Sequence, residues 1–276
     1  MKPKPHFVEP VLKAGIQNCL HVPRIIRCAV TLLSNAHVKV SPFWSLCLGI
    51  TSDRTQPAAV NRLLQNIVQH PHLSRVTDPC LLTREPTMKL LHTLFHLYPT
   101  NTCQPSHVTP LTRLYGGTLS YSDRLLLSIF HLYEKQRRMS IASVFQHWSP
   151  SPTGPPSQDV LEAIASLDPS RVFRTCTTYP TRRQLNVTVV GDTGVRDESL
   201  YDPLFLTLLV VQMLSEHKQL RIADWVRVFR SNVISLVMCV LTSRDQAFRV
   251  VGVSTLGGVL RRLEVRVERH KAIAHC

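Results

Sequence analysis

Two short patterns in the sequence have residue types that could do chemistry. Asp192-Thr193-Gly194 is the tripeptide of aspartic protease active sites, which need two such carboxylates sharing one proton. One copy is present, in a sequence typical of helices, whereas those proteases are β-sheet proteins. His92 and His96 stand on one face of an expected helix and would need a third ligand to hold a metal. A glycine-bounded turn and a partly buried helix surface explain the two patterns without catalysis.

Other enzyme motifs are missing from the sequence. It contains no G-x-x-x-x-G-K-[ST] phosphate loop, no H-E-x-x-H zinc motif and no G-x-S-x-G nucleophile elbow. Eight cysteines are present without a C-x-x-C pair, which argues against a zinc half-site and indicates a reducing compartment. We therefore predict a protein that is not an enzyme and that uses no cofactor or metal.

Arginine is the remaining source of chemistry. The 276 residues include 32 Lys+Arg and 18 Asp+Glu, for a formal net charge of +14. Such an excess favours a polyanionic partner, either nucleic acid or an anionic membrane, and guanidinium groups bind phosphate with two parallel hydrogen bonds. A solvated helix end explains any single arginine pair. The candidate contacts to an RNA backbone are Lys135, Arg137, Arg138, Arg182, Arg183, Arg261, Arg262, Arg266 and Arg269.

The elements that would carry these residues are helices. Apolar residues recur at helical spacing, and Ser, Asp and Pro stand at the expected helix starts. The most apolar windows are about ten residues long, about half of what a membrane span needs. We expect no membrane association, a flexible segment at 149–157 and a polar loop at 179–199. The expected helices cover 25–33, 43–48, 57–68, 85–97, 109–115, 121–138, 140–148, 158–167, 169–176, 203–214, 222–229, 233–241 and 246–263.

Successive short helices with tight turns predict an all-α fold, a solenoid of the armadillo or HEAT kind. One internal echo supports repeats, because Asp168-x-x-Arg171-Val172-Phe173-Arg174 recurs 56 residues later as Asp224-x-x-Arg227-Val228-Phe229-Arg230. Chance similarity between two amphipathic helix starts is the alternative explanation.

Several strings resemble, in the right order, the C-terminal domain of the nucleolar pre-ribosomal-associated protein 1 family. Together they cover roughly residues 110–264, and the ordered set carries the resemblance more than any single motif does. The strings are Tyr115-Gly116-Gly117-Thr118-Leu119-Ser120-x-x-Asp123, Tyr133-Glu134, Ser166-Leu167-Asp168-Pro169-x-Arg171-Val172, Tyr201-Asp202-Pro203-x-Phe205, Trp225-Val226 through Leu236, and Leu241-x-Ser243-x-Asp245.

The resemblance implies a nucleolar, nuclear assembly factor of the large-ribosomal-subunit precursor that works with an RNA helicase and small nucleolar RNAs in ribosomal RNA processing. It implies no catalytic residues. It also implies that residues 109–269 form the family's C-terminal domain, with residues 1–108 continuing an upstream solenoid and 270–276 as a tail. Family members are very long, so this chain would correspond to their C-terminal end. A protein-only adaptor solenoid with an acidic partner is the alternative function.

Overall fold

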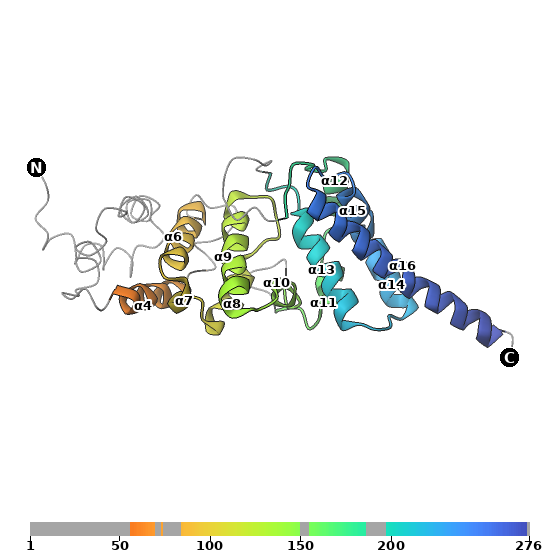
Figure 1. Cartoon of the computed structure of the whole chain (residues 1–276), viewed down its shortest axis with the longest axis horizontal. Helices are drawn as coiled ribbons and strands as arrows, with labels where there is room; N and C mark the ends of the chain where they lie inside the picture. The colour runs from red at the N-terminus through yellow and green to blue at the C-terminus, as the bar shows by residue number, and fades with distance from the viewer. Residues whose placement is uncertain (1–55, 70–72, 74–83, 150–154, 186–196, 275–276) are drawn as a thin grey trace, which may run out of the picture. The chain divides into compact units, whose positions relative to one another are not determined.

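The computed structural model describes residues 56–69, 73, 84–149, 155–185 and 197–274 (Figure 1). These residues form helices and turns, and the β-type pairing among them is one isolated antiparallel bridge between Thr118 and Tyr201. The predicted all-α class is therefore confirmed. The helices expected near 25–33 and 43–48 and most of the segment expected to be flexible lie outside the described residues.

The described chain divides into two compact units. The first contains the described residues up to Leu114 together with 124–139, and the second contains 115–123 and the described residues from Ser140 onward. The helices of the first unit are α4 (Gln56–Val68), α6 (Arg84–Leu97), α7 (Pro99–Thr102), the 3-10 helix η3 (Pro105–His107), α8 (Val108–Leu114) and most of α9 (Tyr121–Arg137).

Helix α7 and the 3-10 helix η3 are the elements of the first unit that the sequence pattern misses. Pro99 predicts the end of α6, but it also opens the next turn, because a proline in the first turn of a helix gives up no intrahelical hydrogen bond. The core of this unit contains Leu91, Phe95 and Tyr133, each at most 1% exposed. The Tyr133 hydroxyl donates to the Gln104 carbonyl at 3.0 Å, so the ring is buried with its polar end satisfied.

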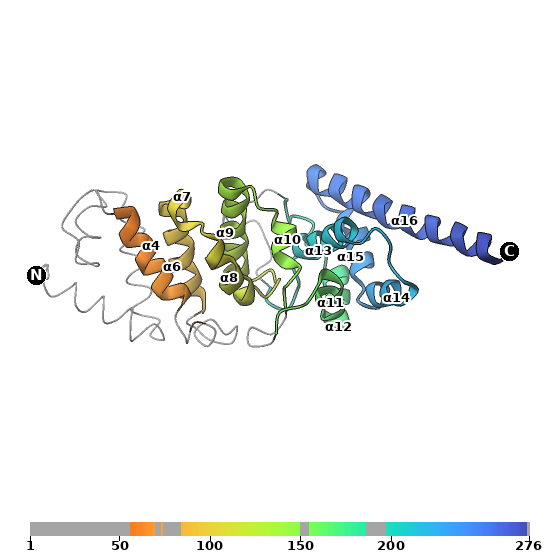
Figure 2. The ribbon, with the colours of Figure 1, turned by 90° about the horizontal axis from the view of Figure 1, so that it is seen from below.

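The second unit holds the remaining helices. Figures 1 and 2 show α13, α15 and α16 packed side by side, with α12 along α15. The helices are α10 (Ile141–Phe145), α11 (Val160–Ala165), α12 (Pro169–Thr177), α13 (Pro203–Glu216), α14 (Ile222–Arg230), α15 (Val233–Val240) and α16 (Gln246–Ala274).

Aspartates begin α12 and α13 as the sequence predicts. Asp168 accepts the backbone N–H of Ser170 at 2.9 Å, and Asp202 accepts that of Leu204 at 3.0 Å. Helix α16 continues to Ala274, beyond the predicted end at 263. None of the described helices is both long enough and apolar enough to cross a lipid bilayer.

The spacing Ser120-x-x-Asp123 at the start of α9 is that of a capping box, and the structure has half of it. The Ser120 hydroxyl accepts the N–H of Asp123 at 3.2 Å. The Asp123 carboxylate, however, turns to the preceding loop and accepts the N–H and the hydroxyl of Thr118 at 2.9 and 2.7 Å and the N–H of Gly116 at 3.2 Å. This carboxylate therefore holds the 116–118 turn, a role that the spacing alone does not reveal.

Three of the strings that carry the family resemblance meet in the core of the second unit, whereas Tyr133-Glu134 belongs to the first unit. The Tyr115 ring stacks on Phe145 with centroids 4.9 Å apart and meets the edge of Phe205 at 5.4 Å. Gly117 adopts φ +68°, and a Cβ there would stand 2.4 Å from the Phe205 ring. The Tyr201 hydroxyl accepts the N–H of Asp168 at 3.3 Å. These residues are therefore structural.

The two copies of the internal echo share burial but not helix position. Val172 and Val228 are fully buried, while Phe173 and Phe229 are about half exposed. Asp168 is the N-cap of α12, whereas Asp224 is the third residue of α14 and accepts the N–H of Arg221 at 3.1 Å. The shared string thus reflects a common amphipathic pattern. Whether the helices form a repeat solenoid stays a prediction, as does a domain boundary at residue 109.

Candidate nucleic-acid interface

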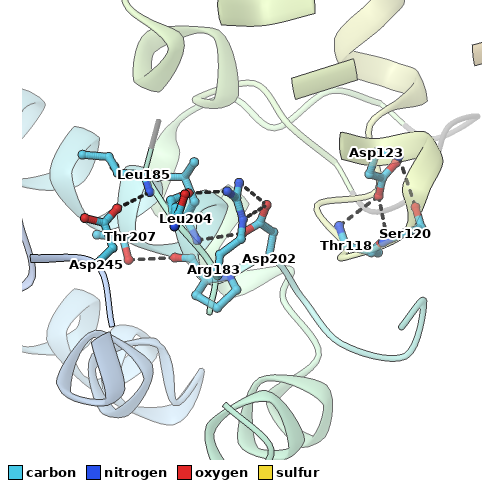
Figure 3. Close-up of polar contacts among 11 residues, drawn as sticks. Thr118, Ser120, Asp123, Arg183, Leu185, Asp202, Leu204, Thr207 and Asp245 are labelled. Atoms are coloured by element: carbon cyan, nitrogen blue, oxygen red, sulfur yellow. Dashed lines mark hydrogen bonds and ion pairs between the residues drawn. The ribbon is translucent and has the colours of Figure 1, made fainter. Parts of the chain in front are cut away.

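The Arg182-Arg183 pair divides into one exposed and one buried side chain. Arg183 is 6% exposed, and its Nε and Nη2 donate to the Asp202 carboxylate at 2.9 to 3.2 Å (Figure 3). Burial acts to lower the pKa of Arg183, but the adjacent charge of Asp202 outweighs it and raises the pKa above the ordinary value. Arg183 is therefore engaged inside the protein, which removes it from the predicted RNA contacts.

Asp202 connects three segments of the second unit. Besides holding Arg183 and capping α13, it donates its own N–H to the carbonyl of Gly117 at 2.8 Å. A carboxylate buried at 1% exposure is tolerated only when its oxygens are paired and hydrogen-bonded, as they are here. The segment that contains Arg183 is thereby fixed against the start of α13.

The loop before α16 fixes the same segment from the other side. Asp245 accepts the N–H of Leu185 at 2.7 Å (Figure 3) and, as a helix cap, that of Ala247 at 2.9 Å. The N–H of Arg244 donates to the carbonyl of Thr181 at 2.8 Å. Backbone segments 181–185 and 243–245 are therefore joined by direct hydrogen bonds.

This junction places Arg182 and Arg244 on the surface of the second unit. Both residues are exposed, and no described residue forms an ion pair with either. The residue before Arg244 and the residue after Arg182 are both buried, so the two arginines stand on a backbone that is held in place. Two guanidinium groups on fixed loops suit contact with successive phosphates.

Arg244 is absent from the predicted contacts because it is a single arginine between Ser243 and Asp245. Adjacent arginine pairs were the main basis for predicting RNA contacts. Arg182 and Arg244 stand 62 positions apart, so the sequence does not mark them as neighbours. The Leu241-x-Ser243-x-Asp245 string marks the segment as structured without showing what it faces.

The predicted contacts at the end of α9 lie in the first unit. Lys135 and Arg138 are exposed. Arg137 turns back, and its Nε donates to the carbonyl of Cys103 at 2.8 Å, closing the end of α9 onto the segment after α7. Arg138 ends the helix with φ 53°. Arg137 is exposed as well, so all three predicted cations lie at the surface, and the hydrogen bond to Cys103 holds Arg137 there.

The predicted contacts on α16 differ from one another in exposure. Arg261 is exposed, whereas the Nη2 of the partly exposed Arg262 donates to the carbonyl of Leu214 at the end of α13. Arg266 and Arg269 belong to the helix, but their side chains lie outside the described residues. Within the second unit, no hydrogen bond between described residues joins the Arg182-Arg183 pair to the Arg261-Arg262 pair.

Of the two patterns suited to catalysis, the His92 and His96 pair lies within the described residues. Asp192 and its neighbours lie outside the described residues. The His92 and His96 rings stack with centroids 3.9 Å apart, and the His92 ring is within 3.3 Å of the Ser128 hydroxyl. Burial, helped by His96, lowers the pKa of His92 to about 4. Within the described part of the chain, no group of three or more His, Cys, Asp or Glu side chains could hold a metal ion.

These features define an all-helical protein whose exposed chemistry is arginine. Comparison with curated proteins shows a distant relationship to nucleolar pre-ribosomal-associated protein 1, with 27% identity over 207 residues in the mouse protein and 25% over 210 residues in the human protein. The matches cover 66% and 68% of this chain but 9% of each relative. The names of these relatives support a nucleolar location for this chain. No family model and no solved structure matches it.

Proposed function

We propose that this protein is a non-enzymatic helical scaffold of nucleolar pre-ribosomal particles and that it contacts the RNA backbone. The distant relationship to nucleolar pre-ribosomal-associated protein 1 supports the proposed association with pre-ribosomal particles. The observation that carries the RNA contact is the exposed pair of Arg182 and Arg244, held on two hydrogen-bonded loops without an acidic partner among the described residues. Lys135, Arg138 and Arg261 are further exposed cations that would add phosphate contacts.

The mechanism is electrostatic binding without base recognition. Each phosphate that a cation neutralises releases condensed counterions, so affinity falls as salt rises. Arg183 takes part indirectly, because its ion pair with Asp202 fixes the segment that presents Arg182. A guanidinium group can bind a phosphate with two hydrogen bonds without reading a base, which favours recognition of the phosphate chain.

A salt titration of RNA binding tests this proposal. The probe is a ribosomal RNA precursor fragment, and the variant carries Arg182→Glu and Arg244→Glu. We expect the slope of log affinity against log salt to become shallower by about 1.4 to 1.8 units if both arginines contact phosphate, since each contact contributes about 0.7 on a single strand and about 0.9 on a duplex. The matched control carries Arg227→Glu and Arg230→Glu, which change the net charge equally on exposed positions of α14.

Equal losses in the variant and the control would show that net charge alone attracts RNA and would contradict the proposed site. Absence of RNA binding at low salt would contradict the RNA contact altogether. Failure of the chain to co-sediment with pre-ribosomal particles would contradict the scaffold role, whatever the RNA result.

A further inference from the structure

Helix α14 exposes apolar side chains that a solvated helix normally turns inward. Ile222, Val226 and Phe229 are 55%, 41% and 48% exposed. Their spacing of four and three residues places them on one face, in a continuous stripe. The inner face is complete without them, because Asp224, Trp225 and Val228 are buried. The stripe is therefore additional to what the core requires.

A row of positive charge runs beside this stripe. Arg227 and Arg230 are exposed and stand at the helical positions next to Val226 on one side. The one acid of the helix, Asp224, is paired with Arg221, whose Nε lies 3.0 Å from the carboxylate. Neither Arg227 nor Arg230 forms an ion pair with a described residue. The outer face thus combines apolar surface with uncompensated positive charge.

The backbone under this face is well anchored. Helix α14 packs on α11 and α15, and its start is capped by the Asp224 carboxylate, which accepts the N–H of Arg221 at 3.1 Å. Just after the helix, the Asn232 side chain donates to the carbonyl of Pro169 at 3.2 Å. A fixed helix loses little entropy when a partner binds, which suits a docking surface.

The charge of the chain limits which molecule could bind the outer face of α14. Residues 1–55 carry seven Lys+Arg and two Asp+Glu, and residues 186–196 carry one of each sign. These segments bring no excess of acid to face the two arginines. A second copy of the chain would bring the same surplus of positive charge, +14 in each chain. An acidic partner from another molecule fits better than either.

The apolar stripe favours an acidic peptide over RNA as the partner. RNA would satisfy Arg227 and Arg230 but would leave the three apolar side chains facing phosphate and ribose. A peptide with apolar anchors at helical spacing and carboxylates beside them satisfies both parts of the surface, as in helix–helix recognition. We propose that the outer face of α14 is a docking surface for an acidic amphipathic segment of a partner protein.

The test starts from a displayed library of random short peptides selected on the full chain. We expect enriched peptides to combine Asp or Glu with Leu, Ile or Phe at helical spacing. Their affinity, measured by fluorescence anisotropy, should fall about tenfold or more with Phe229→Ser and with Arg230→Glu, the size of effect typical of a central contact. Both positions are exposed, so circular dichroism should show an unchanged fold.

The chain supplies a matched control on α16, where Leu260 is 57% exposed and precedes the exposed Arg261. Leu260→Ser and Arg261→Glu should leave the peptide affinity unchanged. An exchange of charge gives the sharpest positive result. Arg230→Glu should regain affinity for a selected peptide in which one carboxylate is replaced by lysine.

Four outcomes would overturn the proposal. They are failure to enrich acidic amphipathic peptides, equal loss in the α14 and α16 variants, loss of ribosomal RNA binding by the α14 variants with peptide binding intact, and loss of binding to anionic lipid vesicles with peptide binding intact. The inference is independent of the proposed RNA site, because Arg182→Glu with Arg244→Glu should weaken RNA binding while sparing the peptide.

Discussion

Loss of the Asp202 side chain should destabilise the second unit more than the loss of any other polar side chain described above. Asp202→Ala leaves the Arg183 guanidinium buried at 6% exposure without its counter-charge. Removal of one partner of a buried ion pair typically costs about 3–5 kcal/mol. The lost cap of α13 adds about 1 kcal/mol. A total near 5 kcal/mol approaches the whole stability of a small domain, roughly 5–15 kcal/mol.

Two further variants separate these contributions. Asp202→Asn keeps a capping oxygen for the N–H of Leu204 but removes the charge, so it should retain the cap and lose most of the ion pair. The double variant Asp202→Asn with Arg183→Met removes both charges and should recover most of the lost stability, because buried pairs replaced by apolar groups are often near neutral.

Urea unfolding followed by tryptophan fluorescence measures these differences. Trp148 and Trp225 both lie in the second unit, so a Trp44→Phe background restricts the signal to the described tryptophans of that unit. A cost below about 1 kcal/mol for Asp202→Asn would place the pair among exposed ion pairs and refute the reasoning. A double variant as unstable as the sum of its two single variants would refute the coupling between the two charges.

Three other positions give predictions that urea unfolding also checks, with circular dichroism as the signal for His92, which lies in the first unit. Gly117→Ala should destabilise the fold by about 2 kcal/mol or more, because φ is +68° and the new Cβ would stand 2.4 Å from Phe205. Gly257→Ala, where the nearest atom is 3.6 Å away, should instead stabilise α16 by about 0.5–1 kcal/mol. A destabilising Gly257→Ala together with a stabilising Gly117→Ala would contradict the backbone conformations assigned to the two glycines. Because the pKa of His92 is about 4 in the folded chain and 6.5 when unperturbed, the unfolded state binds the extra proton between these values, so stability should fall as pH drops from about 6.5 to 4. His92→Gln should flatten this dependence, and an unchanged slope would show that other groups cause it.

The helices could be predicted because their signals are local. Asp168-Pro169 and Asp202-Pro203 mark helix starts through a side-chain cap and a preset φ, and the structure has both caps. The end of α16 was predicted too early, at 263, since its last eleven residues lack the apolar spacing on which the prediction rested. Helix α7 was missed because Pro99 reads equally well as a stop and as a start.

The candidate interface was less predictable, since its geometry depends on residues distant in sequence. Arg182 and Arg183 are identical neighbours in the sequence, yet one is exposed and the other meets Asp202, 19 positions away. Arg262, which is only partly exposed, likewise donates to the carbonyl of Leu214 in another helix. Burial of a side chain depends on which segment packs over it, and the sequence of an arginine pair does not show which segment that is.

The sequence by itself determined the all-α class, most helix starts and the surplus of positive charge, because capping, periodicity and composition act over a few residues or over the whole chain. The tertiary structure alone decided which cations reach solvent. It brought Arg244 to Arg182, buried Arg183 against Asp202 and left the apolar stripe of α14 exposed. These outcomes depend on long-range packing, where the burial of one side chain is set by the position of another far along the chain.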